Sequence, residues 1–273
     1  MIVQSAPEGE PRFVILMKEH MAFAGQLARA YGNDGFERLD PWDEMLFVVE
    51  HHDEGWRGWD ENPGMDPETR LPCHLLKTPR DEVLKTSYGS PDFNERHHPY
   101  CGLLSSMHIW GLYNGRYGMS DRVLINNIPD EYRERWDKML AEQIERQGRL
   151  KTALAARPDS AAWIEDAHLF QNYKQLQFFD TLALYFNLSH GGAREEAKFL
   201  HVPMSETEDV TVTLTPTDDR TYGLSPYPFG ESPLELRLDG RYLGPLSEDE
   251  ESRVGDTIRS APAAHQTIVL VSK

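Results

Sequence analysis

The chain carries the sequence DPWDEMLFVVEHHDEG over residues 40–55, and this stretch indicates both how the chain folds and where its chemistry lies. Asp40 as N-cap and Pro41 at the first helical position predict the start of a helix, because the missing N–H of proline is not needed there. The apolar residues that follow are spaced as on the buried face of a helix, and Gly55 suits the C′ position beyond its end. The stretch therefore predicts an amphipathic helix that closes on His52 and its acidic neighbour.

The pair His52-Asp53 is the most specific chemical feature of the chain. Three distant residues on other predicted helices offer similar chemistry, namely His20, His108 and Asp180. Neutral imidazoles and carboxylates together suit divalent ions such as Fe, Mn or Zn. These five residues predict a metal site with one or two divalent ions per chain.

Each of these residues taken alone has an ordinary structural interpretation. A single histidine in a helix is more often a surface or core residue than a ligand, and a helix C-terminus favours histidine through the helix dipole. Asp180 is the least easily explained in this way, because it lies within the apolar run FFDTLAL at 178–184. A carboxylate buried there needs a metal ion or an arginine nearby. Tyr173 and Gln177 share its helix face by their spacing.

Other periodic segments predict a helical bundle over residues 1–190. Helices are expected at 19–31, at 100–113, from about 129, and from about 159 to 188, and a short strand at 13–16 is expected to pair with residues 2–3. Residues 56–79 are rich in Gly, Pro, Asp and Trp. They predict a long ordered loop that walls a pocket.

The pattern changes after residue 190, where alternating apolar residues predict strands. These are VTVTL at 210–214, LELRL at 234–238 and TIVLV at 267–271, with a hairpin turn expected at Asp239-Gly240. The expected fold is therefore mainly α, a helical bundle with a small C-terminal β appendage over residues 191–273 packed on it. The appendage carries no dense cluster of chemical residues, which favours a role in packing, oligomer contact or as a pocket wall.

The formal net charge of −17 over 273 residues argues against nucleic acid or an anionic membrane as partner, because both would repel the chain. A small anionic substrate would need local cations, for which the candidates near the site in sequence are Arg57, Arg70, Lys77, Arg116 and Lys174. The chain has no apolar run of about 18 residues and no basic leader followed by an apolar stretch. We expect a cytoplasmic protein.

The order of the candidate ligands resembles that of the HD-domain superfamily of metal-dependent phosphohydrolases, whose members carry H…HD…D on a helical bundle. His20, His52, Asp53 and Asp180 match those four positions. The chain is also similar to an uncharacterised bacterial family within that superfamily, over nearly its whole length. The stretches that carry this similarity are HDEGW at 52–56, LLSSMH at 103–108, GLY at 111–113, NY at 172–173, LQ at 176–177 and PYPF at 226–229.

The resemblance implies an enzyme that hydrolyses a small phosphorylated or otherwise anionic substrate with a metal-bound water. It implies that His20, His52 and Asp180 hold the ion and that Asp53 binds or bridges. His108 resembles the extra histidines that hold a second ion in some members, and would bind that ion or the substrate. Asp53 and His108 are the expected catalytic residues, and the candidate substrate contacts are Trp56, Arg57, Trp59, Lys174 and Gln177. Many members carry lysine where this chain has Trp56.

Two other functions stay open at this point. Some HD-domain proteins use a related ligand set to activate O2, which implies a di-iron oxygenase acting on a small polar substrate as the first alternative. The second is a metal-binding protein without catalysis. A stripe on the predicted helix after residue 129 is either an intramolecular core face, which we favour, or the seam of a homodimer; its members are Tyr132, Trp136, Leu140 and Ile144.

Overall fold

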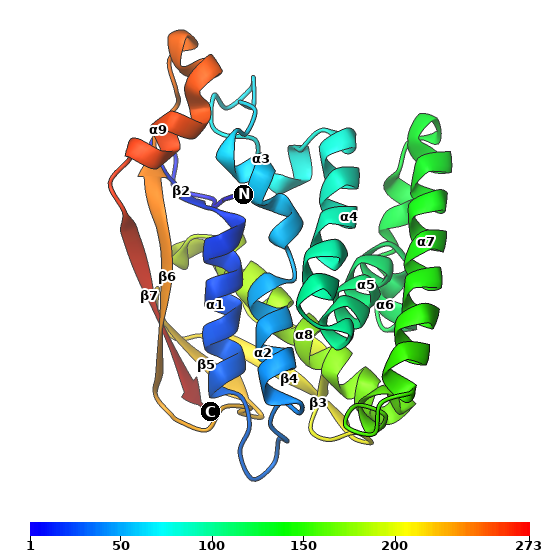
Figure 1. Cartoon of the computed structure of the whole chain (residues 1–273). Helices are drawn as coiled ribbons and strands as arrows, with labels where there is room; N and C mark the ends of the chain where they lie inside the picture. Colours follow the sequence, from blue (N-terminus) through cyan, green and yellow to red (C-terminus); the bar gives the residue numbers. More distant parts are fainter.

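A seven-stranded mixed sheet forms one side of the molecule in the computed structural model, with the helices packed against it (Figure 1). The model describes residues 1–273, apart from the side chain of residue 248. The chain is 53% helical and 19% strand, which makes it a helix-plus-sheet protein. The prediction of a mainly α bundle with a small C-terminal β appendage is therefore wrong.

The sheet has the strand order β1-β2-β6-β7-β5-β4-β3. Its strands are β1 (Ile2–Val3), β2 (Arg12–Ile15), β3 (Ala197–Pro203), β4 (Asp209–Pro216), β5 (Thr221–Ser225), β6 (Leu234–Leu243) and β7 (Ala264–Ser272). The expected pairing of residues 2–3 with the strand near residue 13 is confirmed. What local sequence patterns did not reveal is that β2 continues the sheet by pairing with β6, more than two hundred residues away, and that β3 and β5 are strands.

Gly240 shows why the hairpin prediction is wrong. Asp239 and Gly240 lie inside β6, paired with β7, rather than in a turn. A Cβ at residue 240 would come within 2.6 Å of the Phe13 ring and 2.7 Å of the Val14 carbonyl oxygen. Glycine is therefore required at residue 240 because β2 lies too close for a side chain, and not because the chain turns there.

The helices form layers behind the sheet (Figure 1). They are α1 (Met17–Ala30), α2 (Trp42–His51), α3 (Arg57–Glu61), α4 (Arg80–His97), α5 (Pro99–Tyr113), α6 (Gly115–Gly118), α7 (Asp130–Ala155), α8 (Asp166–Leu188) and α9 (Val254–Ser260). Helix α1 packs on β6 and α8 on β3, α2 contacts α1 and α5, and both α4 and α7 pack on α5. Helix α7 lies at the edge of the molecule opposite β6 and β7 (Figure 1). In the part of the chain that the structure describes, none of these helices combines the length and apolar character needed to cross a bilayer.

Helix α4 was not predicted, and residues 56–79 are not purely loop. Helix α3 lies within that segment, and α2 is followed by a single 3₁₀ turn, Glu54–Trp56, which packs on α4. Gly55 does not end α2 with a left-handed residue, because its φ is not positive. A Cβ there would lie 2.4 Å from the Thr86 carbonyl oxygen and 2.7 Å from the Ser90 nitrogen. Gly55 is needed for the close packing of this turn on α4.

One continuous core joins the helices to the sheet. The ring of Phe186 on α8 contacts Phe23 on α1 and Tyr222 on β5, with ring centroids 5.9 Å and 4.9 Å apart. The change from helix to strand falls between α8 and β3, near the boundary expected at residue 190. The division into two domains stays a prediction.

The stripe on α7 is mostly covered within the chain. Trp136 and Leu140 are buried, in a cluster with Ile109 and Tyr113 of α5. Ile144 remains 46% exposed. The core-face interpretation thus accounts for the middle of the stripe, and the homodimer stays a prediction.

Candidate metal centre

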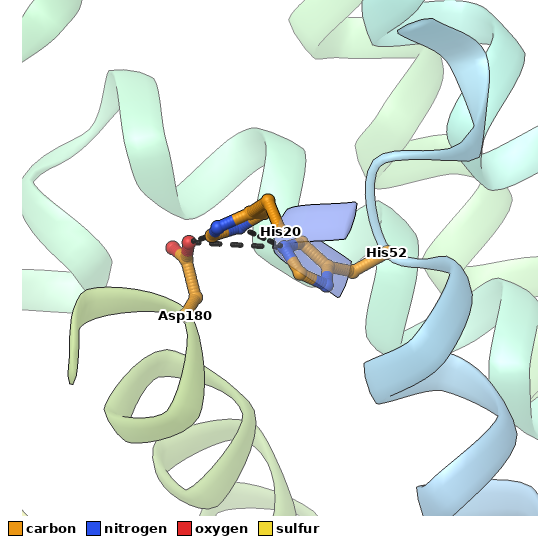
Figure 2. A group of neighbouring side chains, drawn as sticks. All are labelled: His20, His52 and Asp180. Atoms are coloured by element: carbon orange, nitrogen blue, oxygen red, sulfur yellow. Dashed lines mark hydrogen bonds and ion pairs between the residues drawn. The ribbon is translucent and has the colours of Figure 1, made fainter. Parts of the chain in front are cut away.

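Four helices bring the five candidate ligands to one place. His20 lies in the first turn of α1, His52 caps the C-terminus of α2 with Asp53 directly after it, His108 lies on α5 and Asp180 on α8. The side chains of Asp180 and the two histidines from α1 and α2 converge in Figure 2. All but Asp53 are at most 4% exposed. Residues distant in sequence thus meet deep in the helical layers.

The first group of donor atoms has the spacing of ligands around one ion. His20 Nε2 lies 3.3 Å from both His52 Nε2 and Asp180 Oδ1, and His52 Nε2 lies 3.7 Å from Asp180 Oδ1 (Figure 2). Two ligand atoms about 2.0–2.1 Å from an ion and about 90–110° apart are about 2.8–3.4 Å from each other. The three atoms are therefore close to the separations that a shared ion requires.

A second group shares His52 with the first. Its members are His52, Asp53 and His108, whose potential ligand atoms all lie within 4.8 Å of one another. His52 Nε2 is 3.7 Å from Asp53 Oδ2, and the His52 and His108 ring centroids are 5.3 Å apart. Because Nε2 has one lone pair, His52 binds one ion only. A second ion would have to be held by Asp53 and His108, with a carboxylate bridging the two ions.

Each histidine has its other ring nitrogen, Nδ1, occupied by a partner outside the cluster. His20 Nδ1 lies 2.7 Å from Asn187 Oδ1, and His52 Nδ1 donates to the Val49 carbonyl at 2.8 Å. Such a partner fixes the tautomer of a metal-binding histidine and leaves Nε2 as the ligand. The carbonyl can only accept, so the proton of neutral His52 is on Nδ1 and its Nε2 lone pair faces the cluster.

His108 is held by Gln177 in the same manner. The amide nitrogen of Gln177 lies 2.7 Å from His108 Nδ1, and its Oε1 is buried without a hydrogen-bond partner. Rotating the amide by half a turn would exchange the two atoms, so that Oε1 accepts the Nδ1–H. Either way Gln177 engages Nδ1 and leaves Nε2 of His108 available.

Burial and mutual charge shift the pKa values of the group strongly. For His52, burial acts to lower the pKa, but the charges of Asp53 and Asp180 outweigh it and raise the pKa to about 9. Burial lowers the pKa of His108 to about 4. For Asp180, burial acts to raise the pKa, and hydrogen bonds from His20 and His52 hold it well below its usual value. A proton and a metal ion compete for His52, because both need the same lone pair.

The predicted substrate contacts differ in the partners that the structure gives them. Gln177 touches His108. Arg57 is paired with Glu54, and Lys174 binds Asp209 on β4 at 2.5 Å. The two tryptophans belong to the packing of the 54–64 region: Trp56 is 9% exposed in the main core, and the ring of Trp59 lies beside Gly64.

Asp53 is the most accessible of the five ligand candidates, with 13% of its side chain exposed. Two hollows that the structure describes, of about 660 and 230 Å³, lie along β5 and β7 and beside the β2 strand. Neither is lined by a residue of the cluster. Among the five ligand candidates, Asp53 is thus the one with the most contact with solvent.

Sequence reasoning missed Asn187, although a signal was available. Asn187 follows Asp180 by seven residues and thus lies on the same face of α8, where it is fully buried. The carbonyl of Val49 has no side-chain signal and could not have been found this way.

Fold and site together define a helix-plus-sheet protein with a buried candidate metal centre of three histidines and two aspartates. The chain belongs to DUF3891, a family described as protein of unknown function, whose model matches residues 1–244. The matched region contains all five ligand candidates and strands β1 to β6. No curated protein and no solved structure matches the chain with significant similarity.

Proposed function

We propose that this protein is a metal-dependent enzyme that hydrolyses a small phosphorylated or otherwise anionic substrate. The observation that carries the proposal is the convergence of three imidazoles and two carboxylates. In each imidazole, the ring nitrogen Nδ1 contacts a group outside the cluster. A donor set of nitrogen and carboxylate oxygen fits Zn, Mn or Fe. The H…HD…D order, which resembles the HD-domain superfamily, supports the same conclusion.

The chain's own residues have distinct parts in this proposal. His20, His52 and Asp180 would hold the ion, with their orientation fixed by the helices that carry them. A divalent ion at such a site supplies Lewis acidity and lowers the pKa of a bound water toward about 7. Asp53 is the ligand candidate with access to solvent, so one of its oxygens can bind while the other accepts a proton or hydrogen bond. His108 would bind substrate or complete the coordination.

One ion per chain is the stoichiometry that the geometry favours. The two donor groups overlap at His52, which has a single free lone pair, so they do not make two complete and independent sites. A di-iron oxygenase would need a second ion with only Asp53 and His108 as its own ligands. Hydrolysis with a single ion is therefore the better-supported reaction, and two irons per chain would indicate the oxygenase.

The test is metal analysis of aerobically and anaerobically purified protein, with and without reconstitution. We expect about one Zn, Mn or Fe ion per chain, and metal-dependent hydrolysis of a phosphoester. His52→Ala and Asp53→Ala should lose the metal, whereas His97→Ala and His201→Ala should retain it, because those histidines lie outside the cluster. Wild-type protein that stays metal-free after reconstitution would contradict the proposal, and wild-type occupancy in Asp53→Ala would contradict the ligand assignment.

A further inference from the structure

The short segment α6 (Gly115–Gly118), one residue after helix α5, is a left-handed turn rather than a regular helix. Gly115, Arg116, Tyr117 and Gly118 have φ values of 62°, 51°, 57° and 87°, all positive. For residues with a side chain, this conformation brings Cβ close to the backbone and costs free energy. Such strain persists where the surrounding structure enforces it, and it is concentrated at ligand-binding and active sites. The two non-glycine residues of this turn therefore point to a function.

The turn adjoins the metal centre through Gly111 and Tyr173. Gly111 lies almost one helical turn after His108 on α5. A Cβ at Gly111 would lie 2.0 Å from the Tyr173 hydroxyl oxygen and 3.5 Å from Arg116 Cα. The ring of Tyr117 packs edge-on against Tyr173, with centroids 5.1 Å apart. The absence of a side chain at Gly111 thus lets the tyrosine hydroxyl lie between α5 and the turn.

Two buried polar atoms on α8 have no hydrogen-bond partner in this region. They are the hydroxyl of Tyr173, a residue with no exposed surface, and the one amide atom of Gln177, a residue 5% exposed, that does not face His108. Both residues share a helix face with Asp180. A buried hydroxyl without a partner has lost its hydrogen bonds to water, so this arrangement is unfavourable unless a ligand group completes it.

Arg116 supplies positive charge at the same place. Its side chain makes no hydrogen bond or ion pair with any residue that the structure describes, whereas Arg57 and Lys174 are each paired with a carboxylate. Its backbone lies against helix α5, because a Cβ at Gly111 would be 3.5 Å from Arg116 Cα. In a chain of net charge −17, an unpaired guanidinium on a turn that packs against α5, the helix of His108, is a candidate for anion binding.

We propose that Arg116, presented by the left-handed turn, binds an anionic group of the substrate, with the Tyr173 hydroxyl as a second donor. This inference rests on the proposed function of the metal centre. Gly111 is displaced from His108 by nearly one helical turn, roughly 5 Å along the axis. The substrate class is therefore a small molecule whose carboxylate or phosphate group is separated from the bond that reacts at the ion.

The test uses inorganic phosphate as the probe on metal-loaded protein, with metal content measured in every sample. Calorimetry should show phosphate binding to wild type that Arg116→Gln weakens at least tenfold, with the metal retained. The matched control is Arg122→Gln, which removes the same charge from an exposed position in the following loop and should bind phosphate as wild type does. Glycine adopts positive φ without steric cost, so Arg116→Gly should keep the turn folded. A loss of phosphate binding in this variant therefore reflects the missing side chain rather than misfolding.

The outcomes separate this inference from the proposed function. Wild-type phosphate affinity in metal-loaded Arg116→Gln would overturn the role of Arg116 and leave the metal centre intact. An equal loss in Arg122→Gln would show a general charge effect and overturn the inference as well. Wild-type protein that holds no metal would overturn the proposed function on which the inference rests.

Discussion

Each imidazole of the candidate centre is oriented by a different kind of group. Asn187 faces His20, a main-chain carbonyl accepts from His52, and Gln177 faces His108. Two of these partners come from α8, the helix that also carries Asp180. A single helix thus supplies one ligand candidate and positions two others, which makes the geometry sensitive to its side chains.

Replacing Asn187 with leucine tests this positioning at the scale of one residue. Asn187→Leu leaves the Nδ1–H of His20 buried without an acceptor, so the ring is no longer held in the orientation that aims Nε2 at the cluster. Loss of such an outer partner lowers metal affinity by about 10- to 100-fold. The measurement is the metal dissociation constant, obtained by competition with a chelator.

Gln143→Leu is the control for Asn187→Leu. It also replaces a buried polar side chain, at 1% exposure, but lies on α7, which carries no ligand candidate and no partner of one. It should keep wild-type metal affinity. An Asn187→Leu protein that is folded and binds metal as tightly as Gln143→Leu would show that Asn187 does not position the ligand.

At the scale of the element, the contact between α5 and α8 depends on one glycine. Gly111→Ala would place a Cβ 2.0 Å from the hydroxyl oxygen of Tyr173. Overpacking of this kind costs about 1–3 kcal/mol. We expect urea denaturation to show a loss of that size, and Tyr173→Phe to recover part of it in the double variant, because it removes the clashing oxygen.

A glycine-to-alanine substitution on α7 should have the opposite effect on stability. A Cβ at Gly148 would meet nothing within 4 Å, and alanine is favoured over glycine inside a helix by about 0.5–1 kcal/mol. Gly148→Ala should therefore stabilise the protein. If Gly111→Ala were equally stabilising, or if Tyr173→Phe recovered nothing, the close approach of α5 to the tyrosine hydroxyl would be wrong.

The elements differ in how far the sequence could predict them. Helix α7 has apolar residues at helical spacing, and its start was predicted to within about one residue, as were both ends of the largely buried α5. His20, His108 and Asp180 lie on helices that the sequence predicted. Helix α4 contains Gly89 and Pro91 and has few apolar residues, so its pattern did not stand out. The left-handed turn at Arg116 depends on its fit between α5 and α8, which no local pattern contains.

At the scale of the whole molecule, the sheet was the main error because its pairings are non-local. Strands β2 and β6 each have a local sequence pattern typical of a strand, but only the folded chain shows that Val14 pairs with Arg241. Register between segments this far apart is set by tertiary packing, not by turns. Most helices and several single strands could be predicted from local patterns, whereas the order of the strands and the pairing of β2 with β6 could not.

The shared core predicts that neither half of the chain folds alone. A fragment of residues 191–273 would lack β1 and β2 and expose the apolar sheet face that α1 and α8 cover, and residues 1–190 would expose the matching helix faces. Each Å² of apolar surface that stays exposed to water loses about 25 cal/mol of stabilisation. Summed over a buried core, this loss exceeds the usual free energy of unfolding of about 5–15 kcal/mol. We expect both fragments to lack cooperative urea transitions and dispersed NMR spectra.

As a control, a short Gly-Ser insertion in the exposed turn at residues 206–207, between β3 and β4, should leave the full chain folded. A cooperatively folding 191–273 fragment would show instead that the strands after residue 190 form an independent domain.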